Sequence, residues 1–202
     1  MQQQIVIRKA NLLDAKACAM IHKQEIATGF LSQLGVRFLE LLYTAMVLSQ
    51  HALCLVAEDE EKHIVGFISG CYDVRKFYKE FFIKHGLRAF LIILPQIIRL
   101  SILRKIFETI KYPANEVNGN DLPEAELLSI AVNTHLRGLG ISEKLANALF
   151  DEFRKRGIQS LKVVVGTENT RANGFYKKVG FKLHSNISVH KSEISNVYVK
   201  ML

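Results

Sequence analysis

Residues 137–142, Arg-Gly-Leu-Gly-Ile-Ser, have the composition of a site for a phosphorylated cofactor. The two glycines permit a tight turn directly after the apolar run 126–132, which is typical of a mostly buried strand. A helix is then expected to begin near Leu139. Its first N–H groups have no partner inside the helix, and with the positive end of the helix dipole they form an anion site, to which Arg137 adds a full charge. Taken alone, the stretch fits equally well a corner that uses glycine for geometry only.

The length and composition of the chain predict one folded domain over residues 1–202. Its 202 residues are 49% apolar, enough for one sizeable core, and no Pro/Gly/Ser-rich linker divides them. The three cysteines are an odd number at wide spacing on apolar segments, which is typical of reduced, buried thiols rather than disulfides or metal ligands. The first residues lack the basic and apolar regions of a signal peptide, so we expect a cytoplasmic protein.

The positive charge is concentrated in one segment. Between Arg75 and Lys111 there are nine Lys/Arg and two Glu, so this segment carries +7 of the net charge of +8. The rest of the chain is close to neutral, which argues against a nucleic-acid binder with a basic face on its main fold.

The segment 74–122 that contains these charges is also rich in large apolar residues. Its longest uncharged run, 89–98, has ten residues, which is short of the ~20 that span a bilayer, and Pro95 interrupts it. We therefore expect two helices. They would lie on an anionic membrane surface, close over an acceptor site, pack as ordinary core helices or form a dimer contact, and the sequence leaves these alternatives open.

Strands and helices alternate along the rest of the chain. Amphipathic helices are expected after the first strand, from Leu31 to Leu48, and in two further runs that end at Gly157 and Gly180. The helix between the strands 126–132 and 160–165 implies that these two strands are parallel, joined by a right-handed crossover. The expected strands are 4–9, 52–58, 63–71, 126–132, 160–165, 181–190 and 194–201, of which the last two form an antiparallel pair.

Two motifs in this order resemble those of the GNAT N-acetyltransferase superfamily. Residues 137–142 resemble its pyrophosphate motif Gln/Arg-x-x-Gly-x-Gly/Ala, with Ser142 in place of the last small residue. Residues 169–181, Asn-Thr-Arg-Ala-Asn-Gly-Phe-Tyr-Lys-Lys-Val-Gly-Phe, resemble its signature Asn-x-x-Ala-x-x-hydrophobic-Tyr-x-x-x-Gly-Phe. Each motif alone is weak, but both at this separation are specific. The resemblance runs from Ile5 to the C-terminus, with 74–122 longer than in a minimal member.

This resemblance implies the α/β GNAT acyl-CoA N-acyltransferase fold. In that fold a mixed central sheet is flanked by helices and has a V-shaped splay between its fourth and fifth strands; here a helical insertion at about 74–122 is added. Acetyl-CoA, the donor substrate, would lie in the splay with its pantetheine paired to a strand and its pyrophosphate on the glycine turn. The residues implied for cofactor contact are Ile130, Ala131, Val132, Arg137, Gly138, Leu139, Gly140, Ile141, Ser142, Asn169, Phe175, Tyr176 and Lys178.

Direct acetyl transfer needs a deprotonated amine, stabilisation of the thioester oxygen and a proton for the leaving thiolate. The resemblance implies that Tyr176, a phenol with an ordinary pKa of about 10, supplies that proton, although a tyrosine that only packs against the cofactor fits as well. A backbone N–H of Ile130 or Ala131 would stabilise the oxygen. Asn169 would hydrogen-bond the pantetheine arm, cap its own helix, or do both.

The general base is the least determined group. Glu126 stands where the histone-acetyltransferase branch of the family places its basic glutamate. A second branch, which resembles ribosomal-protein N-terminal acetyltransferases, has its glutamate at the position of Val164. Glu124 or a chain of waters could replace either, and a purely structural role for Glu126 fits equally. No histidine has metal-ligand spacing, so we expect no metal.

The sequence therefore predicts an acetyl-CoA-dependent N-acetyltransferase. Its acceptor would be a primary amine, with a small amine or amino sugar favoured over a protein amine. The alternative is a non-catalytic acyl-CoA-binding module docked to a membrane or partner through the basic, apolar insertion. We expect no nucleic-acid partner, a peripheral membrane contact through 75–111 as one use of that segment, and a homodimer as an open alternative.

Overall fold

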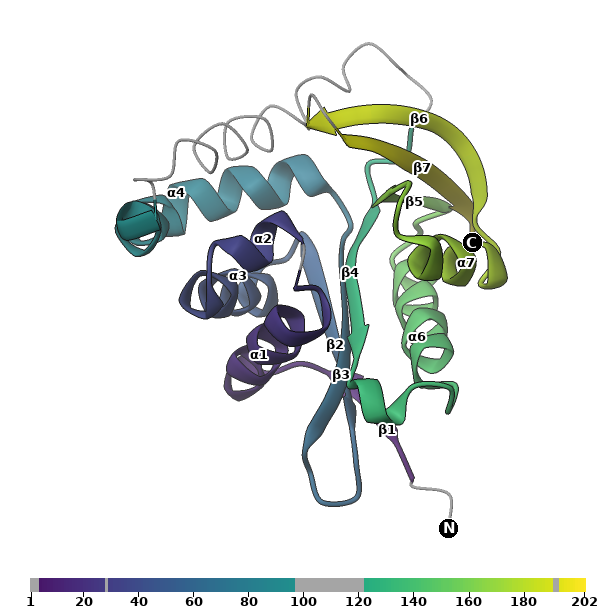
Figure 1. The fold of residues 1–202 in the computed structure, drawn as a ribbon, viewed down its shortest axis with the longest axis horizontal. Coiled ribbons are helices and arrows are strands. Elements are labelled where there is room, and N and C mark those ends of the chain that lie inside the picture. Colours follow the sequence, from purple (N-terminus) through teal and green to yellow (C-terminus); the bar gives the residue numbers. More distant parts are fainter. Residues whose placement is uncertain (1–3, 28, 97–121, 191–192) are drawn as a thin grey trace.

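A computed structural model describes residues 4–27, 29–96, 122–190 and 193–202, and is built on a seven-stranded mixed sheet (Figure 1). The strand order is β1-β2-β3-β4-β5-β7-β6, and every neighbouring pair is antiparallel except β4 and β5. This arrangement confirms the predicted α/β fold. The strands are β1 (Val6–Lys9), β2 (Ala52–Glu58), β3 (Ile64–Cys71), β4 (Glu126–Val132), β5 (Ser160–Gly166), β6 (Lys182–His190) and β7 (Glu193–Met201).

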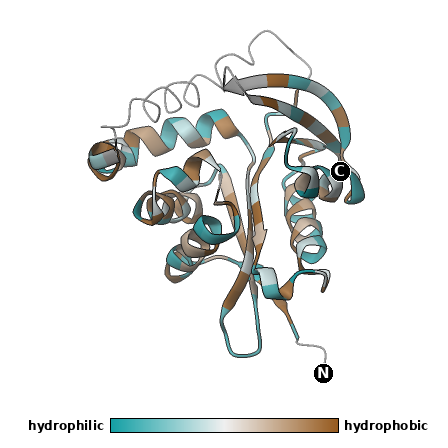
Figure 2. Cartoon of the chain, viewed as in Figure 1, coloured by the Kyte–Doolittle hydropathy of each residue, from teal (hydrophilic) through white to brown (hydrophobic). Residues whose placement is uncertain are grey.

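Helices cover both faces of the sheet (Figure 1). Each face has its own buried hydrophobic cluster, and β2 is buried along its whole length because it is covered from both sides. Figure 2 shows the central strands as mostly hydrophobic, whereas the helices mix both kinds of residue. One face carries α1 (Ala15–Glu25), α2 (Phe30–Gln33), α3 (Val36–Leu48) and α4 (Val74–Ile93), and the other carries α6 (Ile141–Lys155) and α7 (Thr170–Lys178).

Strands β4 and β5 meet at one end and then diverge. β4 is paired with β3 from Glu126 to Val132, and β5 with β7 along its whole length. Between β4 and β5, however, the register contains the single pair Glu126 and Lys162. The predicted V-shaped splay between the fourth and fifth strands is therefore confirmed (Figure 1).

Two expected helices differ from the structure. The run from Leu31 to Leu48 is not one helix, since it breaks into α2 and α3 at Gly35, whose φ of 84° is outside the helical region. In the insertion, the first expected helix is α4, which passes at Leu94–Gln96 into a short 3₁₀ turn that contains Pro95. The second expected helix falls in 97–121, outside the described residues.

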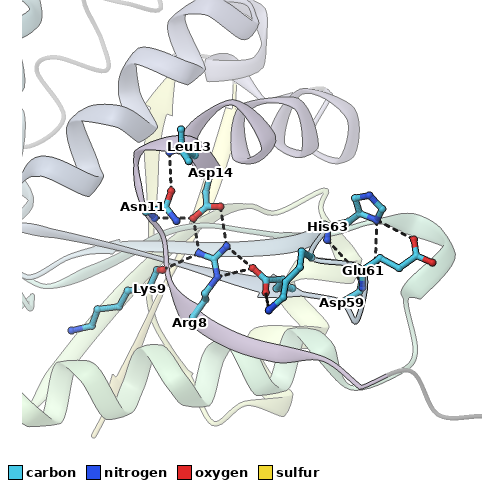
Figure 3. A network of polar contacts seen from close by, with 10 residues as sticks. Arg8, Lys9, Asn11, Leu13, Asp14, Asp59, Glu61 and His63 are labelled. Atoms are coloured by element: carbon cyan, nitrogen blue, oxygen red, sulfur yellow. Dashed lines mark hydrogen bonds and ion pairs between the residues drawn. The ribbon is translucent and has the colours of Figure 1, made fainter.

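The first strand is tied to its surroundings by an ionic cluster around Arg8 (Figure 3). Its guanidinium donates to both carboxylate oxygens of Asp14, at 2.6 and 3.0 Å, and to Glu58 on β2 at 2.7 Å. Burial alone would raise the pKa of Asp14, but the hydrogen bonds from Arg8 and from the Asn11 backbone N–H outweigh it and leave that pKa lowered. The cluster fixes β1 against β2 and the start of α1.

The three cysteines, Cys18, Cys54 and Cys71, are free thiols and all are buried, as predicted. Within the described ranges, no helix is both long and apolar enough to cross a bilayer. The same part of the chain holds no group of three or more His, Cys, Asp or Glu side chains that could ligate a metal ion.

Candidate functional site

The turn after β4 contains two glycines and leads into α6. After a 3₁₀ turn at Thr134–Leu136, both Gly138 (φ 83°) and Gly140 (φ 75°) have positive φ, which side chains disfavour. A Cβ at either glycine would meet no atom within 4 Å, so the backbone conformation and not lack of space requires glycine. Gly140 precedes α6 without a side-chain cap, which leaves the first N–H groups of that helix available to an anion.

Arg137, which the sequence predicted as a charge for this anion site, forms an ion pair with Glu25 at the end of α1. The same carboxylate accepts the backbone N–H of Thr134 at 3.0 Å and its hydroxyl at 2.7 Å. The Glu25 side chain is only 4% exposed. Glu25 thus fastens the glycine turn to α1. The sequence did not indicate this contact, because the partners are 109 and 112 residues apart.

The backbone of Ile130 and Val132 faces the splay. The N–H of Asn133 donates to Val65 on β3 at 2.9 Å, so this pair is a hydrogen-bonded one. Pairs in an antiparallel ladder alternate, so Ala131 also turns its backbone groups toward β3, while Ile130 and Val132 turn theirs away from it. Of the two N–H groups expected to stabilise an oxyanion, the alternation favours that of Ile130.

A cavity of about 170 Å³ lies where β4 and β5 separate, on the face covered by α1 to α4. It is lined by residues of α2, α3, α4, β3 and β4 and, across the split, by Val164 of β5. Leucine and methionine side chains supply much of its remaining wall. Its polar lining consists of Tyr43, Ser69, Tyr78, Glu126 and Ser129.

Glu126 faces this cavity from the first position of β4 and is 5% exposed. Its carboxylate lies 3.9 Å from the ammonium of Lys162, which is 1% exposed and donates to the Pro123 carbonyl at 2.8 Å. Lys162 was not among the predicted site residues, although a lysine inside an apolar strand was a visible signal of a buried partner.

A second buried polar pair supports the cavity wall. Nδ1 of His22 on α1 lies 2.6 Å from the hydroxyl of Tyr43 on α3. Burial lowers the pKa of His22 to about 4 and raises that of Tyr43 well above its usual value, so both side chains are neutral near pH 7. No spacing in the sequence indicates this pair. It places a fixed, uncharged hydroxyl beside Ser69 and Ser129.

Tyr176 lies on the opposite face of the sheet from the cavity. It is 6% exposed and packs in the cluster beneath α6 and α7, with its ring centroid 5.7 Å from that of Phe181. Burial raises the pKa of its phenol. The structure therefore does not bring Tyr176 and Glu126 into one cavity. The sheet lies between them, and the splay between β4 and β5 is the gap in that sheet.

The position of α7 is set by two asparagines. The side chain of Asn169 caps the helix by accepting the Ala172 N–H at 3.1 Å, the structural role expected for it. Asn173, which was not predicted, donates to the Gly166 carbonyl at 3.0 Å and accepts the hydroxyl of Tyr198 at 2.9 Å. Because Asn173 is buried and joins α7 to β5 and β7, it fixes the helix that carries Tyr176.

The remaining predicted contacts lie near the helix starts. Lys178 at the end of α7 forms an ion pair with Glu143 in the first turn of α6. The hydrogen bond from Lys178 is the main cause that lowers the pKa of Glu143. Phe175 packs, partly buried, beside Tyr176, and Leu139 is 58% exposed. The pair between Glu143 and Lys178 thus bridges α6 and α7 beside the glycine turn.

Comparison with known proteins identifies the family. The sequence model of the acetyltransferase (GNAT) family matches residues 24–181, which is most of the chain. The chain belongs to the GNAT acetyltransferase family. The GNAT assignment from two short motifs is therefore confirmed.

Two curated relatives match a short part of this GNAT chain. An uncharacterized N-acetyltransferase of Methanocaldococcus jannaschii is 40% identical over 58 residues, 29% of this chain and 26% of the relative. The [ribosomal protein bS18]-alanine N-acetyltransferase of Haemophilus ducreyi is 38% identical over 60 residues, 30% of this chain and 41% of the relative. The match thus covers less than half of either relative.

Solved structures share the GNAT fold over nearly the whole chain. Ard1 from Thermoplasma volcanium has a TM-score of 0.62 at 18% identity, with 98% of this chain and 97% of the other covered. The PaiA N-acetyltransferase from Thermoplasma acidophilum, in complex with coenzyme A, has a TM-score of 0.60 at 15% identity, with 98% and 99% covered. At these identities the likeness shows the fold alone.

Proposed function

We propose that this protein transfers the acetyl group of acetyl-CoA to a primary amine by direct attack of the amine on the thioester. The observation that carries the proposal is that the splayed strand β4 is followed along the chain by a glycine turn and then by the uncapped start of α6. The free edge of β4 can pair with the pantetheine of acetyl-CoA. The backbone N–H groups of the glycine turn and of the helix N-terminus, which come next along the chain, can bind its pyrophosphate. The coenzyme A complex of the PaiA protein, which has the same fold, supports this choice of donor.

In this proposal the donor binds along the splay. The pantetheine pairs with the backbone around Ile130 and Val132, and the pyrophosphate accepts N–H groups from 138–142. Ser142 retains its N–H, so it can replace the small residue of the motif. Arg137 contributes mainly by holding the glycine turn in place through its ion pair with Glu25. Asn169 lies near the pantetheine of the bound donor, and Lys178 lies near its adenosine.

The acceptor amine would enter from the cavity. Its volume of about 170 Å³ suits the amine-bearing end of a small molecule. Four hydroxyls, from two tyrosines and two serines, suit an acceptor that is itself rich in hydroxyls, and the carboxylate of Glu126 attracts an ammonium. These features favour an amino sugar or small amine over a protein amine, although a relative that modifies a ribosomal protein keeps the latter as an alternative.

In the chemical step, the base and the acid act from opposite faces of the sheet: Glu126 from the cavity and Tyr176 from the side of α6 and α7. The amine nitrogen bonds to the thioester carbon, and the N–H of Ile130 stabilises the oxygen that becomes negative. About 13 Å of strand separates Ile130 from Glu126, so the carboxylate would take the amine proton through water in the cavity. As the C–S bond breaks, the phenol of Tyr176 gives its proton to the thiolate. The raised pKa of Tyr176 keeps that proton in place until then.

The alternative of a non-catalytic acyl-CoA-binding module is tested with the same protein. A panel of amino sugars, polyamines and peptides is assayed for release of free CoA, and turnover of any one amine separates an enzyme from a binder. The melting temperature is measured with and without acetyl-CoA. A ligand that binds only the folded state at 100 times its Kd stabilises by about 2.7 kcal/mol, so an unchanged melting temperature at saturating acetyl-CoA would contradict the donor assignment.

A further inference from the structure

Helix α4 is apolar on two sides, and only one of them is used by the fold. Its inner residues, such as Phe77 and Phe81, are buried against α3 and the sheet. A helix that merely covers a sheet needs one apolar stripe and a polar outer face. Large apolar side chains that are 45–75% exposed instead lie on α4 and at the first residue of the 3₁₀ turn that follows it: Phe82, Ile83, Leu87, Phe90 and Leu91 on the helix, and Leu94 in the turn.

All of these side chains except Phe82 form a band. At 100° per residue, Ile83, Leu87 and Leu94 point within about 40° of one another, and Phe90 and Leu91 lie on either side of them. A contiguous exposed apolar band of this kind marks an interaction surface.

The band is surrounded by positive charge. Between Val74 and Ile93 there are five Lys/Arg and one Glu, a net charge of +4. Lys76 and Lys84 are engaged with Asp73 and Glu80. The other three, Arg75, Lys79 and Arg88, are exposed and have no acidic partner among the described residues. The partner that fits this face therefore has an apolar interior and a negatively charged surface.

We propose that the outer face of α4 docks on an anionic lipid bilayer. Its leucine, isoleucine and phenylalanine side chains enter the boundary between headgroups and acyl chains, and Arg75, Lys79 and Arg88 contact the negative headgroups. The helix lies in the plane of the surface. A symmetric contact with a second copy would bring the same basic residues of two chains together, so the charge favours lipid over a dimer.

Docking would also position the site proposed above. Tyr78, on the inner side of α4, lines the cavity together with Glu126. The helix that faces the bilayer is therefore also a wall of the cavity. If the proposed function holds, the acceptor amine is one presented at or near a membrane surface, whereas the docking itself does not depend on catalysis.

The test is co-sedimentation of the full chain with vesicles of phosphatidylcholine alone and of phosphatidylcholine with phosphatidylglycerol. Binding is expected only with the anionic vesicles and should weaken as salt is raised. Leu87→Glu, and separately the double variant Lys79→Glu with Arg88→Glu, should reduce binding at least ~10-fold. The matched control is Leu13→Glu, because Leu13 is 90% exposed on a different element, and it should bind like the unmodified protein.

Equal sedimentation with both kinds of vesicle, or none with either, would overturn the proposal. So would a dimer, detected by light scattering, that Leu87→Glu converts to monomer, since the face would then belong to a second copy. All four substituted side chains are exposed, so melting curves should confirm that the variants fold. The CoA-release assay, run without vesicles, tests the proposed function separately.

Discussion

The carboxylate of Glu126 lies 3.9 Å from the ammonium of Lys162, at the residue pair that joins β4 to β5. Both side chains are nearly fully buried, so the narrow end of the splay contains opposite charges instead of apolar packing. Buried pairs of this kind contribute little net stability relative to apolar residues. We infer that the carboxylate is retained for the cavity that it faces.

Glu126→Gln should lower the rate of acetylation by about 10²-fold or more, because it removes the group proposed to take the amine proton. The variant should also unfold more easily, since Lys162 would keep its charge without the nearby carboxylate. The rate is measured as CoA release at saturating amine. Glu124→Gln is the matched control, because Glu124 is exposed and outside the cavity lining. A rate that falls with Glu124→Gln and not with Glu126→Gln would reverse the assignment.

Tyr176→Phe should lower kcat by about 10²-fold and leave the melting shift caused by coenzyme A unchanged. The ring contacts with Phe175 and Phe181 are kept, and only the hydroxyl that would protonate the thiolate is lost. Tyr198→Phe is the control. It removes the hydrogen bond to Asn173 and should cost about 1 kcal/mol of stability with little loss of rate. If Tyr176→Phe turns over normally, Tyr176 is a packing residue.

Glu25→Ala should weaken coenzyme A binding ~10-fold and raise KM for acetyl-CoA, with kcat nearly unchanged. The substitution removes the acceptor for Thr134 and Arg137, so the glycine turn loses its connection to α1 while the reacting groups stay in place. Isothermal titration with coenzyme A measures the effect. Thr134→Val, which keeps the backbone hydrogen bond, should have a smaller effect. Unchanged affinity in Glu25→Ala would exclude this positioning role.

The parts of the fold that depend on local pattern could be predicted from the sequence. The periodicity of 126–132 and 141–153, with glycines between them, predicted a strand, a turn and a helix, because each step depends on residues close in the chain. The family motifs added the splay, which no local pattern contains. The single helix predicted for 31–48 was wrong because the apolar stripe continues across Gly35, and the positive φ of that glycine, not the stripe, decides where the helix ends.

Contacts between distant residues could not be predicted. Glu25 with Arg137 and His22 with Tyr43 depend on how α1 packs against other elements, and neither pair has a spacing that would indicate it. The predicted roles of Tyr176 and Glu126 remain predictions. What the structure adds is that these two side chains lie on opposite faces of the sheet.

His22→Gln should make the stability of the protein less dependent on pH between about 6.5 and 4. The pKa of His22 falls from 6.5 to about 4 on folding because the ring is buried beside Tyr43. In that interval the unfolded chain binds the proton and the folded one does not, so stability falls as pH drops, by roughly 3 kcal/mol in all. Glutamine can still accept from the Tyr43 hydroxyl and has no such proton. Melting temperatures of both proteins are compared from pH 7 to pH 4. If both proteins lose stability equally as the pH falls, His22 is not the group whose protonation opposes folding, whereas a smaller loss in the variant identifies it.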